Sequence, residues 1–145
     1  MNEVETKGRL CMKFSEIKKE EWIELKPYLD TCLIPYAGLK GDEEPWAVTE
    51  RLEQLRDVMD LVERPFAGRV VTYPAVQYCF RDDEFALQLL ASIAENLKSG
   101  VFKFVVVAAP APIDGAESAP QIDLVIHPGM ESADVQDKIL ELWGK

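Results

Sequence analysis

Apolar side chains recur at helical spacing along three stretches of the chain. The clearest stripe advances in steps of four, three, four and three residues and consists of Val48, Leu52, Leu55, Met59 and Val62. This spacing places the stripe on one face of an amphipathic helix, which Pro45 begins and Pro65 ends. We expect that face to be buried against a sheet.

Two further stripes predict a helix after residue 82 and another after residue 132, and a short helix is expected over residues 15–25. Each of the three helices begins at a residue whose side chain can cap its amino terminus. These cap residues are Ser15, Asp82 and Ser132. Gly100 stands where a glycine commonly ends a helix, so the third helix should stop there.

Between the helices lie short apolar runs that predict strands. They cover residues 32–34, 69–73, 102–108 and 121–127. A proline follows each run and should end the strand, because proline has no amide hydrogen for the ladder. These prolines are Pro35, Pro74, Pro110 and Pro128.

The resulting element order, α-β-α-β-α-β-β-α, predicts an α/β fold, a three-layer sandwich around a four-stranded, mostly parallel sheet. The link over residues 109–120 contains no helical pattern, so we expect the last strand to be an antiparallel edge strand. A thioredoxin-like domain without the CxxC motif is the alternative. Residues 1–11 are read as a flexible tail or extension, and residues 12–145 as a single domain.

Charge and cysteine usage narrow the partners and the compartment. The net charge is −10, which disfavours nucleic acid and anionic lipid. Cys11, Cys32 and Cys79 form no CxxC pair, as is typical of a reducing compartment. No signal peptide and no apolar run long enough to span a membrane is present. We therefore expect a cytoplasmic protein that neither binds nucleic acid nor inserts into a membrane.

Candidate binding residues follow the predicted strands. Ligands of parallel sheets bind beyond the carboxyl ends of strands. After the first strand lie Tyr36, Lys40 and Asp42, and after the second lie Gln77, Tyr78 and Arg81. These polar and aromatic side chains are candidates for ligand binding, although any solvated loop contains such residues.

His127 is the single histidine and therefore the natural candidate for acid–base chemistry. If the last strand is antiparallel, His127 should lie near Asp30 and Thr31, and the Asp30 carboxylate could orient its ring. The sequence contains no GxSxG elbow, no phosphate loop and no metal-ligand cluster. We therefore assign no catalytic residue, no metal and no cofactor, and interpret His127 as structural.

Two segments resemble a known family. The segment Tyr28-Leu-Asp-Thr-Cys-Leu-Ile-Pro35 is similar to the opening motif of the YpiF-like proteins of Bacillus-type bacteria, and the segment from Phe66 to Pro74 resembles the next block of that family. The resemblance implies a domain of unknown function with no established catalytic residues. Some members are encoded near menaquinol–cytochrome c reductase genes, which implies an accessory role in respiration.

Two functions remain open at this point. The first is a non-enzymatic interaction or accessory protein, with a protein partner and a link to respiratory-complex biogenesis. The second is a small-molecule-binding domain or enzyme that uses the carboxyl edge of the sheet. The sequence names neither the ligand, the partner nor the oligomeric state.

Overall fold

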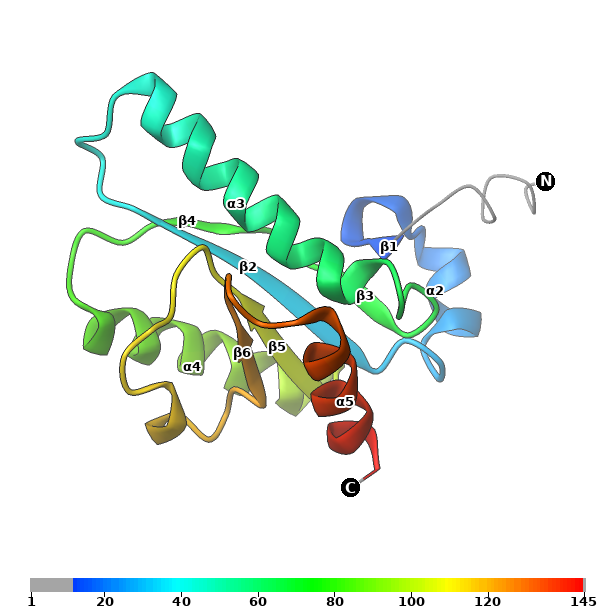
Figure 1. Ribbon diagram of the computed structural model, residues 1–145. Coiled ribbons are helices and arrows are strands. Elements are labelled where there is room, and N and C mark those ends of the chain that lie inside the picture. The colour runs from blue at the N-terminus through cyan, green and yellow to red at the C-terminus, as the bar shows by residue number, and fades with distance from the viewer. Residues whose placement is uncertain (1–11, 145) are drawn as a thin grey trace.

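A computed structural model describes residues 12–144 of the chain (Figure 1). Within this range, six strands and four α-helices form a mixed α/β domain. The elements are β1 (Met12–Lys13), the 3₁₀ helix η1 (Phe14–Glu16), α2 (Lys19–Leu25), β2 (Thr31–Leu39), α3 (Pro45–Glu63), β3 (Val70–Thr72), β4 (Val76–Tyr78), α4 (Asp83–Gly100), β5 (Phe104–Ala108), the 3₁₀ helix η2 (Ala116–Ser118), β6 (Leu124–Ile126) and α5 (Ser132–Trp143). The predicted tail over residues 1–11, with Cys11, lies outside the described residues.

The sheet has the strand order β1-β3-β2-β5-β6, and β4 pairs with the second half of β2. Every strand pair within the described chain is parallel. The mixed α/β class and the mostly parallel sheet are therefore confirmed. The sheet has six strands rather than the four expected, and the thioredoxin-like alternative finds no support.

The expectation of an antiparallel last strand is wrong. β6 runs parallel to β5, with Val106 opposite Leu124 and Ala108 opposite Ile126. Although the connection contains no α-helix, Ile113, Ala119 and Ile122 on it are buried in the core. The connection therefore crosses one face of the sheet as a packed segment and returns the chain to the amino edge before β6 begins.

Strand β2 also differs from expectation, because it continues through Pro35 to Leu39. Its neighbour on one side is interrupted at this point, since β3 ends opposite Leu33 and β4 begins opposite Tyr36. The missing amide hydrogen of Pro35 thus falls close to a gap in the neighbouring strand, where a ladder hydrogen bond is least needed.

Helices cover both faces of the sheet (Figure 1). One core cluster joins α4 to alternate side chains of the central strands, including Cys32, Val105 and Val107. The other joins α3 and α5 to the intervening side chains, such as Leu33 and Val106. This alternation is what a sheet buried on both faces requires.

Helix α3 buries Leu55 and Val62 as predicted, but Leu52 is 38% exposed and that assignment is wrong. All the buried residues of α3 lie from position 55 onward, because only this part of the helix packs deeply against the sheet and α5. None of the described helices is long and apolar enough to span a bilayer.

The three predicted caps have different outcomes. Asp82 caps α4 as predicted, since its carboxylate accepts a hydrogen bond from the amide of Phe85 at 3.0 Å. Ser15 lies inside η1, and Ser132 is the first residue of α5 after the cap Glu131, so both of those predictions are wrong.

Candidate functional site

The parallel sheet brings the carboxyl ends of its strands to one edge. After β2 the chain turns toward the face covered by α3, whereas after β5 it turns toward the face covered by α4. Two adjacent strands whose connections diverge in this way define a topological switch point, where open α/β sheets bind their ligands. Here the switch point lies between β2 and β5.

A crevice of about 150 Å³ lies at this switch point. Its lining comes from the end of β2, from the amino-terminal parts of α3 and α4, and from the segment after β5. The charged and phenolic side chains among them are Tyr36, Lys40, Arg51 and Asp83. We call this cavity the switch-point crevice.

The two cations of the crevice each contact a backbone carbonyl oxygen. The Arg51 guanidinium lies 3.5 Å from the carbonyl oxygen of Ala37, which is a long contact for a hydrogen bond. The Lys40 ammonium donates to the carbonyl oxygen of Arg81 at 2.9 Å. The Asp83 carboxylate accepts a hydrogen bond from the amide of Asp114, which ties the segment after β5 to α4.

Tyr36 forms one wall of the crevice, and local backbone geometry holds its ring. Gly38 has a φ of +65°, and a Cβ added to it would lie 3.2 Å from the Tyr36 ring. Burial raises the pKa of Tyr36 above its ordinary value, and a hydrogen bond with the Cys79 thiol raises it further. The phenol therefore stays protonated, and its hydroxyl is engaged by the Cys79 thiol.

The other candidates at this edge do not line the crevice. Gln77 and Tyr78 lie on β4 with exposed side chains. The Arg81 guanidinium stacks on the ring of Phe85, 4.5 Å from its centre. His127 follows β6, and its Nδ1 lies 2.9 Å from the carbonyl oxygen of Pro128.

The expected approach of His127 to Asp30 is wrong, because a parallel β6 places the two residues at opposite edges of the sheet. Asp30 precedes β2 at the amino edge, where Arg69 binds its two carboxylate oxygens at 2.9 and 3.1 Å. The Thr31 hydroxyl also donates to it at 3.1 Å. Asp30 is thus a structural ion-pair residue.

Sequence reasoning missed Arg51 and Asp83. Arg51 stands on the helix predicted between Pro45 and Pro65 but outside its apolar stripe, and Asp83 follows the predicted cap Asp82. The signal that could have found both residues is topological. The first turns of helices that follow parallel strands lie at the carboxyl edge, where the ligand site is expected.

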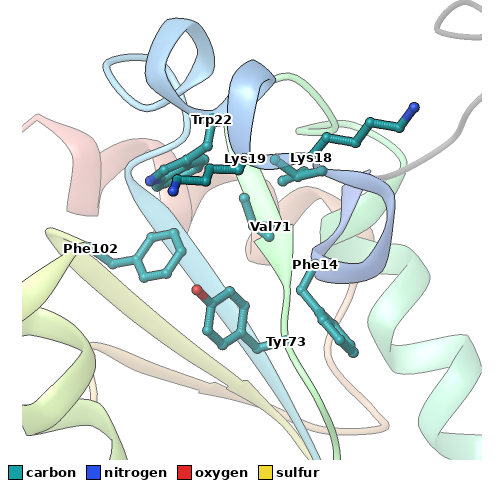
Figure 2. Close-up of a pocket in the computed structure, with 8 residues that line it drawn as sticks. Phe14, Lys18, Lys19, Trp22, Val71, Tyr73 and Phe102 are labelled. Atoms are coloured by element: carbon teal, nitrogen blue, oxygen red, sulfur yellow. The ribbon is translucent and has the colours of Figure 1, made fainter.

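A second and larger cavity, of about 260 Å³, lies near β1 and β3 (Figure 2). Four aromatic rings surround it in a continuous chain of contacts. They belong to Phe14, Trp22, Tyr73 and Phe102. We call it the aromatic cavity. It shares no lining residue with the switch-point crevice.

Cys32 and Cys79 are free and buried. Burial raises the pKa of the Cys32 thiol to about 12, so this group is unreactive as a nucleophile near neutral pH. Within residues 12–144, no three His, Cys, Asp or Glu side chains are arranged to hold a metal ion.

The fold and the crevice together define a doubly wound, parallel α/β domain with a small polar site at its switch point. Residues 20–139 match the family described as "Protein of unknown function (DUF2487)", and the chain belongs to that family. The match supports the expected domain of unknown function, but it carries neither the YpiF-like name nor an origin in Bacillus-type bacteria. No curated protein and no solved structure matches the chain.

Proposed function

We propose that this domain binds a small anion in the switch-point crevice and acts as a binding protein rather than an enzyme. One observation carries the proposal. Two cationic side chains, Lys40 and Arg51, and the protonated phenol of Tyr36 line one crevice where the connections after β2 and β5 diverge. This is the position at which parallel α/β sheets bind ligands.

The charge of the crevice favours an anion. Lys40 and Arg51 outnumber the single carboxylate of Asp83, and that carboxylate already accepts the Asp114 amide. The lining residues alone therefore carry an excess of positive charge in a chain whose net charge is −10. The Glu43 carboxylate lies near Arg51 but does not line the crevice. The guanidinium of Arg51 offers paired donors that match the oxygens of a carboxylate or a phosphate.

The volume of the crevice restricts the size of the anion. At about 150 Å³, it is smaller than the roughly 300–1,000 Å³ typical of pockets for drug-sized ligands. A phosphate ion or a short organic acid fits this space better than a nucleotide does.

The chemistry of the lining groups favours binding over catalysis. A general base must be unprotonated at working pH, yet Tyr36 stays protonated and the two cations have no free lone pair. The one carboxylate of the lining, Asp83, already accepts the Asp114 amide. The lining therefore supplies hydrogen-bond donors and positive charge for a ligand.

Thermal unfolding of the full chain tests this proposal. Inorganic phosphate, acetate and oxalate are added separately at constant ionic strength. A concentration of 100 times Kd stabilises the native state by about 2.7 kcal/mol, which raises Tm by about 5 °C or more.

Arg51→Gln should abolish this shift. Arg56→Gln is the matched control, because Arg56 lies on the same helix and pairs with Asp57 on the surface. The proposal is wrong if no anion shifts Tm, or if Arg51→Gln responds like the control.

A second candidate function, protein binding, is favoured by exposed aromatic side chains near the same edge. Trp46 lies in the first turn of α3, Tyr78 is the last residue of β4, and Phe80 follows β4. All three side chains are exposed, and Phe80 is 77% exposed. Aromatic residues are enriched at interfaces. We therefore propose a cytoplasmic partner with an apolar docking segment, in keeping with the respiratory accessory role that the resemblance implies.

Retention of a partner by immobilised protein tests this second function. Phe80→Asp should abolish retention, whereas Ile23→Asp should preserve it, because Ile23 is equally exposed (74%) but lies on α2. A partner retained equally by both variants would contradict docking at this edge.

A further inference from the structure

The aromatic cavity has a closed floor and an open rim. Val71 and Phe102 are buried and form the apolar floor. Helix α2 and η1 contribute the side chains around the rim, as Figure 2 shows. The cavity therefore exposes an apolar surface to solvent near the short edge strand β1.

The rings around the cavity contact one another in sequence. Tyr73 meets Phe102 edge-to-face, with centroids 5.1 Å apart, and meets Phe14 at 6.2 Å. Phe102 in turn lies 6.2 Å from Trp22. Four rings held in this way present edges and faces at several angles, and a planar aromatic group packs well against such a surface.

One polar group projects into this apolar space. Figure 2 shows the Tyr73 hydroxyl pointing toward the floor, between Phe102 and Val71. Among residues 12–144, no side chain or backbone group forms a hydrogen bond with this hydroxyl. Burial raises the pKa of Tyr73, and the nearby Cys32 raises it further. The hydroxyl therefore remains a donor for a hydrogen-bond acceptor on a ligand.

One cationic side chain reaches across the rim. Figure 2 shows Lys19 extending toward the side of the cavity that Trp22 and Phe102 form, whereas the ammonium of Lys18 points away. In the part of the chain that the structure describes, Lys19 has no ion-pair partner. The neighbouring Glu20 and Glu21 do not line the cavity.

We propose that the aromatic cavity binds a small aromatic carboxylic acid, with the ring packed among Trp22, Tyr73 and Phe102 and the carboxylate directed to Lys19 and the Tyr73 hydroxyl. The volume fits this class of ligand. An apolar cavity of about 150 Å³ holds benzene, and the aromatic cavity, at about 260 Å³, leaves room for a short acidic side chain. A single cation suits a single carboxylate better than a polyphosphate.

The test uses the full chain and follows the indole N–H signals of its tryptophans by NMR. The Trp22 signal is assigned as the one that Trp22→Phe removes. Three probes are titrated: 3-phenylpropionate, the neutral 3-phenylpropan-1-ol, and propionate, which has no ring. The acid should shift the Trp22 signal with saturation, the alcohol should bind about two- to tenfold more weakly, and propionate should leave the signal unchanged.

Two conservative variants separate the polar contributions. Lys19→Gln changes an exposed side chain and should reduce the preference for acid over alcohol to less than about twofold. Tyr73→Phe keeps the ring and should weaken binding of the acid by about tenfold. Lys26→Gln, just beyond the end of the same helix, is the control and should bind the acid like the wild type.

Several results would overturn the proposal. Equal binding of acid and alcohol would remove the role of Lys19. If no probe shifts the Trp22 signal, the cavity does not bind an aromatic acid. The same result is expected if another part of the chain fills the cavity, and it contradicts the proposal equally. A Trp22 signal that shifts with protein concentration alone would assign the cavity to a second copy of the chain.

Discussion

Replacing Arg69 should loosen the attachment of α5 to the amino edge of the sheet. The guanidinium binds both carboxylate oxygens of Asp30 and lies 4.0 Å from the ring centre of Trp143. The same indole donates to the Thr31 hydroxyl at 2.8 Å and meets Phe66 at a centroid distance of 4.9 Å. Arg69 thus connects the segment before β2 to the last turn of the chain's final helix.

The expected magnitude follows from these contacts. The side chains of Arg69 and Asp30 are 38% and 26% exposed, so solvent weakens their ion pair to about 1 kcal/mol. Stacking of the guanidinium on an indole contributes about 0.5–1 kcal/mol. Arg69→Met should therefore lower the free energy of unfolding by about 1.5–2 kcal/mol.

Arg69→Lys distinguishes geometry from charge. Lysine keeps the positive charge but loses the paired donors and the planar stack, so this variant should still lose about 1 kcal/mol. Urea unfolding, with Arg64→Met as the control, measures both changes. Arg64 contacts Asp60 at 3.6 Å on the helix surface, and its loss should cost less than about 0.5 kcal/mol. Stability of Arg69→Lys equal to the wild type would refute the reasoning.

Three further predictions concern the core and the crevice. Leu55→Ala should lower the free energy of unfolding in urea by about 2–5 kcal/mol. Leu52→Ala, on the exposed part of α3, should lower it by less than about 1 kcal/mol. Equal losses of stability would contradict the placement of α3. Gly38→Ala should cost about 1–2 kcal/mol, because φ is positive there and the new Cβ would crowd the Tyr36 ring; an unchanged Tm would contradict it. Since burial raises the pKa of Cys32 to about 12, this thiol should resist alkylation in the native protein at neutral pH and react after unfolding, as peptide mapping by mass spectrometry can show.

The helices were largely predictable because their signals are local. The stripe of α3 and the cap of α4 need only the residues within one or two turns. What failed were the features that depend on neighbours distant in sequence. Leu52 satisfies the helical period, but its half of α3 is not deeply packed on the sheet. The spacing of apolar residues within a helix does not indicate how much of that helix lies over the sheet.

The course of β2 shows the same limit. Pro35 is a local stop signal, and it would end a strand that had continuous partners on both sides. Here β3 and β4 leave a gap near Pro35. Pro35 is therefore tolerated because of how β3 and β4, which lie far along the chain, pair with β2.

The direction of β6 governs which candidate residues meet. A link without a helix favoured an antiparallel return, but its apolar residues Ile113 and Ile122 cover the face of the sheet in place of a helix. Ile113 stands in a segment whose composition is typical of a surface loop, and Ile122 falls in the strand predicted over residues 121–127. Because β6 is parallel, His127 lies at the carboxyl edge of the sheet and does not meet Asp30 at the amino edge.

Of the candidate site, the carboxyl edge was predictable and the crevice was not. The rule that ligands bind beyond strand ends selected Tyr36, which lines the crevice but lies within β2 rather than after it. Arg51 could not be selected, because its position in the crevice depends on the approach of α3 to Ala37. An arginine on an acidic helix face is otherwise typical of a solvated surface.

The small size of the switch-point crevice is a consequence of the chain's own Tyr36. Gly38 adopts a left-handed conformation, and the Tyr36 ring occupies the space that a Cβ at this position would need. The ring is buried, and its hydroxyl is engaged by Cys79. Because this aromatic side chain forms one wall of the crevice, it limits the space there, and a volume of about 150 Å³ suits the small anion that we propose as the ligand.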